Sequence, residues 1–271
     1  PDRSGAAPNN FLEAYLAGNY RDNPPKGLSG VDPHAFNNIT KPAPLLNASL
    51  PAFSYQVLTS VEADPPAGIR TAAGIIENQW YRIELDPVTG GLCSWIDKET
   101  GRELAAQHGP HRLGQYIYET VDHPKGHAAV FTGDFSNESN FGTPRPDTPF
   151  RRQGPTQVQL APAHVDSMGV CIEAIMQAPG ARSVRVQYLL PHHEKALHVD
   201  MVVDKEYVTR PESVYVTFPF ALENPTFHLD LNGVPLEPEI EQLPGSCRDW
   251  YGIQRWAEVS AKNASIVMVP V

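Results

Sequence analysis

The sequence predicts an all-β protein that is built mainly from one large antiparallel sandwich, and three observations favour this fold class. Alternating apolar and polar residues recur in short runs between residues 81 and 231, as half-buried strands require. The 27 prolines and 20 glycines supply turns between these runs. Helical spacing is confined to residues 10–16, where Asn10 and Glu13 are placed as in a capping box. Successive hairpins make antiparallel sheets, and two such sheets packed face to face make a sandwich.

The chain divides into three predicted parts. Residues 1–49 form a linker-like segment with at most one short helix, because Pro, Gly, Asn and Ala dominate their composition. Residues 50–67 give one strand, in which aromatic and aliphatic residues alternate with polar ones, and then a hinge with two prolines. Residues 68–271 form the large sandwich domain.

The most informative stretch is residues 76–105, which predicts two strands and two tight turns. Tyr81, Ile83 and Leu85 alternate with charged or polar neighbours, so one face of the first strand can bury apolar surface. Residues 86–91, with the sequence DPVTGG, then reverse the chain, because proline fixes one φ angle and the glycines accept positive φ.

After this turn, Leu92, Ser94 and Ile96 resume the alternation on one face of the second strand. Residues 98–101 make the second turn. Further strands are predicted at residues 115–120, 128–131, 170–176, 183–190, 196–204, 214–220, 226–231 and 265–271. One face of the strand at 196–204 carries Leu197, Val199, Met201 and Val203, and the other carries His198, Asp200 and Asp204.

Two blocks of the sequence carry a family resemblance. The first has the residues Glu77-Asn78, Tyr81-Arg82, Asp86, Thr89-Gly90-Gly91-Leu92, Ser94, Asp97-Lys98 and Gly101-Arg102-Glu103-Leu104. The second is QLPGSCRDWY at residues 242–251, followed by QRWAEVS at residues 254–260. Together they resemble the C-terminal β domain of glycoside hydrolase family 38, which contains the α-mannosidases. The resemblance covers residues 50–271.

The resemblance implies a large sandwich of the galactose-mutarotase-like supersandwich kind, with residues 50–67 as the remnant of a smaller sandwich. It also implies that the large domain is incomplete at its C-terminal end. Since the chain opens without a methionine, in polar residues typical of a linker, we expect a fragment or a processed chain.

In the resembling family, the chemistry belongs to an N-terminal α/β domain, where two Asp and two His hold a zinc ion and one Asp is the retaining nucleophile. The resemblance therefore implies that this chain has no catalytic residue, no metal ligand and no cofactor of its own. Zinc is expected in the missing catalytic domain. The implied partners are that domain and an α-mannoside or other glycan.

The family's metal motif is a His-x-Asp followed by Gly and Trp, and the sequence contains three His-x-Asp pairs without that continuation. These pairs are His164-Asp166, His198-Asp200 and His228-Asp230. Because residues i and i+2 of a strand share a face, each pair is predicted to lie on the polar face of an ordinary strand. The run His192-His193-Glu194 follows a proline and predicts a solvated turn.

The best candidate for a functional surface is the block of residues 245–256. It concentrates aromatic rings with charged side chains that can form paired hydrogen bonds, as the apolar face and hydroxyl rim of a sugar require. The ligand-facing or interdomain candidates are Arg248, Asp249, Trp250, Tyr251, Arg255 and Trp256. The structural alternative is an Arg-Asp pair beneath packed indole rings.

Composition excludes several classes of partner. A net charge of −10 and a pI near 5.4 argue against binding to a nucleic-acid backbone. No apolar run approaches twenty residues, so no membrane span is expected. Four glycosylation sequons, at Asn38, Asn47, Asn137 and Asn263, favour a secreted or vacuolar/lysosomal protein.

Three cysteines, Cys93, Cys171 and Cys247, lack the spacing of a zinc site and are expected to be inert thiols. Two functional alternatives stay open from sequence. One is an independent carbohydrate-binding or interaction module without catalysis. The other is a mutarotase or polysaccharide lyase with the same sandwich, which would require a catalytic His or Tyr on a concave sheet.

Overall fold

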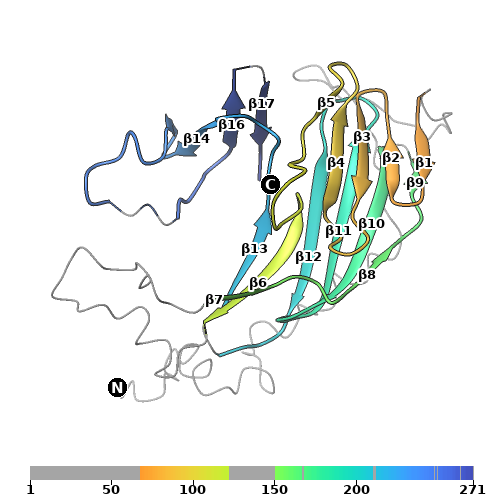
Figure 1. Cartoon of the computed structure of the whole chain (residues 1–271), viewed down its shortest axis with the longest axis horizontal. Coiled ribbons are helices and arrows are strands. Elements are labelled where there is room, and N and C mark those ends of the chain that lie inside the picture. The colour runs from red at the N-terminus through yellow and green to blue at the C-terminus, as the bar shows by residue number, and fades with distance from the viewer. Residues whose placement is uncertain are drawn as a thin grey trace, which may run out of the picture. The chain divides into compact units, whose positions relative to one another are not determined.

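Antiparallel sheets alone build the part of the protein that the computed structural model describes (Figure 1). The described residues are 68–121, 150–166, 168–209, 212–246, 248, 250–262 and 264–270, and they contain no helix. All of them belong to the same compact unit of the chain. The all-β, antiparallel prediction is therefore confirmed. The predictions for residues 1–67, including the short helix and the first strand, and for the strand at 128–131 lie outside the described residues.

The first sheet is a five-stranded meander in which each strand pairs with the next along the chain. Its strands are β1 (Arg70–Ala72), β2 (Ile75–Glu77), β3 (Tyr81–Leu85), β4 (Leu92–Asp97) and β5 (Arg102–Glu103). The predicted turn at residues 86–91 joins β3 to β4. There the Gly90 N–H donates to the Asp86 carbonyl at 2.8 Å, and the Asp86 carboxylate accepts the Val88 N–H at 2.8 Å.

The alternation predicted for β4 is wrong, because the strand contains a β-bulge. Glu84 pairs with Ser94 but Leu85 pairs with Leu92, so Cys93 is the extra residue. Because of the bulge, Trp95 lies on the buried face and is 8% exposed, whereas the sequence predicted Ser94 and Ile96 there. Ser94 instead donates its hydroxyl to the Glu103 carboxylate of β5 at 2.6 Å, and Ile96 is only half-buried.

The second sheet contains the three longest described strands and packs against the first. Its members are β8 (Gln157–Leu160), β9 (His164–Val165), β10 (Gly169–Ala178), β11 (Ala181–Pro191) and β12 (His198–Lys205). The faces predicted for β12 are confirmed, since its even-numbered residues are exposed and its odd-numbered apolar residues pack against the core. The run His192-His193-Glu194 forms the predicted turn between β11 and β12, but the prediction that the turn is solvated is wrong for His192. His192 is 6% exposed, and its Nε2 lies 2.8 Å from the Asp166 carbonyl oxygen.

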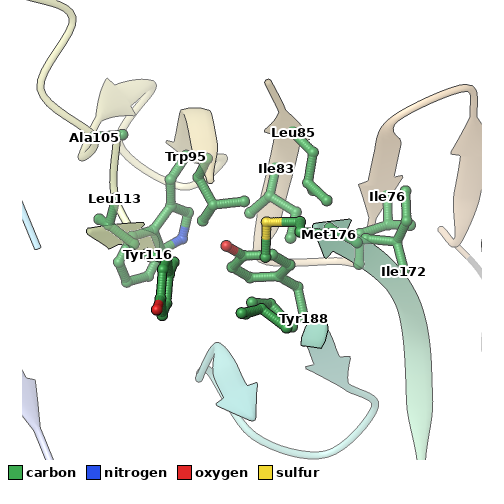
Figure 2. Packing of buried hydrophobic residues seen from close by; sticks show 14 of the residues in the cluster. Ile76, Ile83, Leu85, Trp95, Ala105, Leu113, Tyr116, Ile172, Met176 and Tyr188 are labelled. Atoms are coloured by element: carbon green, nitrogen blue, oxygen red, sulfur yellow. The ribbon is translucent and has the colours of Figure 1, made fainter. Parts of the chain in front are cut away.

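One hydrophobic core joins the two sheets and gives the protein its sandwich character (Figure 2). From the first sheet come Ile76, Ile83, Leu85 and Trp95, and from the second come Ile172, Met176 and Tyr188. Figure 2 shows Ile83 and Leu85 approaching Met176 and Tyr188 from the opposite sheet. Tyr116, Leu113 and Ala105 extend the same core beside Trp95.

Two smaller sheets complete the described architecture. The third has the order β13 (Glu212–Thr217), β6 (Gln115–Val121), β7 (Phe150–Gln153). The fourth has the order β15 (Val234–Leu236), β14 (Thr226–Leu231), β16 (Ala257–Ala261), β17 (Ala264–Met268). The strand predicted at 226–231 has those bounds in the structure, whereas the strand predicted at 214–220 begins and ends earlier as β13.

The buried tyrosine of β6 gives a prediction for alkaline pH. Burial, with Glu212 and Glu206 nearby, raises the pKa of Tyr116 from 10.0 to about 12. The protonated ring therefore contributes stability that is fully present below pH 10 and is lost as the pH rises through 12. Tyr116→Phe should lose less stability than the parent chain across that window, as measured by urea unfolding at several pH values. At neutral pH it should cost about 1 kcal/mol, because the hydrogen bond to the Pro179 carbonyl is lost. Equal losses on raising the pH would contradict the assignment.

Candidate functional site

The predicted site block lies in the long connection between β15 and β16, on the fourth sheet. This connection, residues 237–256, has no strand among its described residues and leaves the sheet after β15 (Figure 1). Its return to β16 is fixed by the backbone, since the Asp230 N–H donates to the Trp256 carbonyl at 3.0 Å and the Gln254 N–H donates to the Asp230 carbonyl at 2.9 Å.

An ion pair also holds the β15–β16 connection to the sheet at Asp230. Asp230 of β14 is 1% exposed, and one of its carboxylate oxygens accepts a hydrogen bond from Arg255 Nε at 2.6 Å. The Arg255 side chain is 70% exposed, so its remaining guanidinium nitrogens face solvent. This hydrogen bond raises the pKa of Arg255 above its usual value. The other oxygen, Asp230 Oδ1, has no hydrogen-bond partner among the described residues.

A second hydrogen bond closes the outer part of the connection. The Tyr251 hydroxyl donates to Gln242 Oε1 at 2.7 Å, which joins two segments nine residues apart. The neighbours of these two residues are strongly exposed, with Leu243 at 81% and Trp250 at 75%. Ile240, on the same connection, is 71% exposed. The connection therefore presents large apolar side chains to the outside, which is typical of a binding surface.

The five predicted site residues that the structure describes fall into three groups. Arg248 and Trp250 are exposed, Tyr251 and Trp256 are half-buried, and Arg255 is tied to the sheet. Asp249 lies outside the described residues. Arg255 pairs with Asp230, which lies outside the predicted block, so the alternative of an Arg-Asp pair beneath packed indole rings stays a prediction.

Sequence reasoning missed the role of Asp230, which it placed on a polar strand face within the pair His228-Asp230. That assignment is wrong for Asp230, which is buried. The only sequence signal for the burial of Asp230 was its place in a short apolar strand. Its partner, Arg255, lies 25 residues away along the chain, so a local pattern does not connect the two.

The other His-x-Asp residues behave as surface pairs. His164, Asp166, His198 and Asp200 are exposed, as predicted for polar strand faces. His164 Nε2 lies 2.9 Å from Cys171 Sγ, and burial raises the pKa of the Cys171 thiol to about 11. Within the described ranges, no group of three or more His, Cys, Asp or Glu side chains is arranged to hold a metal ion.

Two clefts lie beside the sandwich. The first, of about 520 Å³, is lined by Tyr81, Trp95, Asp97, Lys195, Leu197 and Ile266, among other residues. The second, of about 510 Å³, is lined by Arg102, Leu222, Glu223, Asn224, Lys262 and Ala264, among others. None of the five predicted site residues that the structure describes lines either cleft.

The ion pair between Asp230 and Arg255 predicts that removing either partner has a different effect on stability. Arg255→Ala should lower the urea midpoint more than Asp230→Ala does, because it leaves a buried carboxylate without its donor. Asp230→Ala removes only the acceptor of an exposed guanidinium, which water can solvate instead. Arg255→Lys is the matched control that keeps the charge, and it should recover part of the loss. A larger loss for Asp230→Ala would mean that the carboxylate has structural partners beyond Arg255.

In the described part of the chain, the β15–β16 connection presents exposed aromatic, aliphatic and charged side chains and is held to the sheet at Asp230. The described part of the chain contains no helix of the length and apolarity that a membrane span needs. The site is interpreted from its own residues, because no family model matches the sequence and no curated protein matches it.

Proposed function

We propose that this chain is the non-catalytic C-terminal β domain of a retaining, metal-dependent, α-mannosidase-like glycoside hydrolase. Its fold would be the galactose-mutarotase-like supersandwich. It would support the catalytic domain and line the sugar cleft, while zinc and the nucleophile come from that domain. The chain alone would be inactive, because a sandwich positions a site without supplying its chemistry.

The observation that carries this proposal is the exposed Trp250 on a connection that is anchored at Asp230. A free indole face is suited to stacking on the apolar face of a sugar ring, and Arg255 adds donors for its hydroxyl rim. The positions of the two sequence blocks add support. The first forms the β3–β4 hairpin of the core, and the second forms this connection.

The alternative is an independent carbohydrate-binding or interaction module. The continuous core between the first and second sheets favours it, since such a core can support folding without a partner domain. The two candidates differ in what the complete native protein does. An enzyme releases mannose and stops when a chelator removes its metal, whereas a module binds glycan without turnover.

The first test is the denaturing mass of the protein from its native source. A mass several times 29.8 kDa is expected, and release of mannose from an aryl α-mannoside should then be sensitive to a chelator. A native mass near 29.8 kDa would overturn the enzyme proposal and leave the module.

The second test changes the tryptophan in the complete protein. Trp250→Ala should raise KM for the mannoside about tenfold, since an aromatic contact contributes about 1.4 kcal/mol and kcat depends on the other domain. Tyr207→Ala removes another exposed ring, 59% exposed, and should leave KM unchanged. An unchanged KM for Trp250→Ala would remove this residue from the sugar cleft.

A further inference from the structure

The turn between β14 and β15 contains the single Asn-Gly dipeptide of the chain. Asn232 and Gly233 form this two-residue turn, and Leu231 pairs with Val234 on either side of it. Their φ angles are +55° and +79°, as the type I′ turn of a tight hairpin requires. Asparagine and glycine are the residues that accept such angles most readily, so the shape of the turn accounts for both of them.

The dipeptide also places two groups that can react with each other beside one another. These are the side-chain amide of Asn232 and the backbone nitrogen of Gly233, and both residues are exposed. Among the described residues, neither the Asn232 side chain nor the Gly233 N–H has a hydrogen-bond partner. A Cβ added to Gly233 would meet nothing within 4 Å, so the space around this nitrogen is open. The fold therefore leaves both reacting groups accessible.

Asn224 provides a comparison within the same chain. It is exposed and has a φ of +47°, so its own backbone resembles that of Asn232. The residue after it is Pro225, whose nitrogen carries no hydrogen. That nitrogen is not a nucleophile towards the preceding side chain. The two asparagines thus differ in the one group that the reaction needs.

We propose that Asn232 is a site of spontaneous deamidation. The Gly233 nitrogen loses its proton and attacks Asn232 Cγ, a new C–N bond forms, and the side-chain nitrogen leaves as ammonia. Water then opens the resulting five-membered succinimide at either carbonyl. One product is an aspartate with the original backbone, and the other is an isoaspartate whose backbone runs through the former side chain. Water is the only co-reactant, and the inference does not depend on the glycosidase proposal.

The isoaspartyl product would disturb the pairing of β14 with β15. It adds one methylene to the backbone of a two-residue turn, and the length of the turn fixes the register of a hairpin. β15 is the outer strand in the order of the fourth sheet, and within the described ranges it pairs with β14 alone. It leads directly into the β15–β16 connection. Deamidation would therefore loosen the start of that connection, while Asp230 and Arg255 still hold its end.

The test incubates the folded 271-residue chain at mildly acidic and mildly alkaline pH and maps its peptides by mass spectrometry. We expect a gain of about 1 Da at Asn232, as the amide becomes a carboxylate. The gain should be faster at alkaline pH, because the attacking nitrogen must lose its proton. The modified peptide should accept a methyl group from an isoaspartyl methyltransferase. In the isoaspartyl form, the amides of Val234 and Leu236 should exchange hydrogen at least threefold faster.

Two variants separate the chemistry from its consequence. Asn232→Gly removes the side-chain amide, keeps a residue that accepts positive φ, and should show no mass gain in this turn. Asn232→Asp has the new charge on the original backbone, so exchange at Val234 and Leu236 should stay near that of the parent chain. Circular dichroism establishes that both variants fold. A gain at Asn232 only in the urea-unfolded chain, or an equal gain at Asn224, would overturn the proposal. Unchanged exchange in the isoaspartyl form would overturn the effect on β15.

Discussion

Tyr188→Ala is expected to lower the free energy of unfolding by about 3–5 kcal/mol, the range found when a buried aromatic side chain is removed from a core. Tyr188 lies in the middle of β11, is 0% exposed, and sits between the two sheets (Figure 2). Its hydroxyl donates to the Gly90 carbonyl at 3.0 Å, so the residue also connects the second sheet to the β3–β4 turn. The loss of apolar contact and the cavity left behind both act in the same direction.

Urea unfolding of three variants separates these contributions. Tyr188→Phe keeps the ring and should cost about 1–2 kcal/mol, because the buried Gly90 carbonyl loses its donor. Tyr207→Ala is the exposed control and should cost less than about 0.5 kcal/mol. A loss under about 1 kcal/mol for Tyr188→Ala would show that the two sheets do not share one core.

Gly180→Ala is expected to cost about 2–5 kcal/mol, from two separate sources. Gly180 lies in the turn between β10 and β11 with a φ of +73°, a conformation that costs an L-residue about 1–2 kcal/mol. In addition, an added Cβ would lie 2.2 Å from Tyr118 Cε2. Tyr118 is 7% exposed and its hydroxyl binds the Glu212 carboxylate, so the ring cannot move away freely. Overpacking of this kind typically costs about 1–3 kcal/mol.

Gly101→Ala is the matched control for this substitution. Gly101 has a φ of +70°, and a Cβ added there would meet nothing within 4 Å. It should therefore lose only the conformational part, about 1–2 kcal/mol, and the difference between the two variants measures the clash with Tyr118. Thermal or urea unfolding of the parent chain and both variants gives the comparison. Equal losses would mean that Tyr118 relaxes without cost.

The sequence determined those features that depend on neighbouring residues. The alternation at Tyr81, Ile83 and Leu85 predicted the buried face of β3, and the prolines and glycines of residues 86–91 predicted the turn that follows. The two faces of β12 and the bounds of β14 were also predictable. In each case a period of two, or the φ angle of a particular residue, encodes the local structure.

Only the tertiary structure decided which residues far apart in the chain would meet. The bulge at Cys93 depends on the pairing of β4 with β3, and it reverses the faces of every later residue in that strand. Asp230 is buried because Arg255 reaches it from the far end of the β15–β16 connection. The first cleft exists because the outer strands of three sheets, β5, β12 and β17, end next to one another. Register and long-range ion pairs are set by the partner strand or side chain, which a local pattern does not contain.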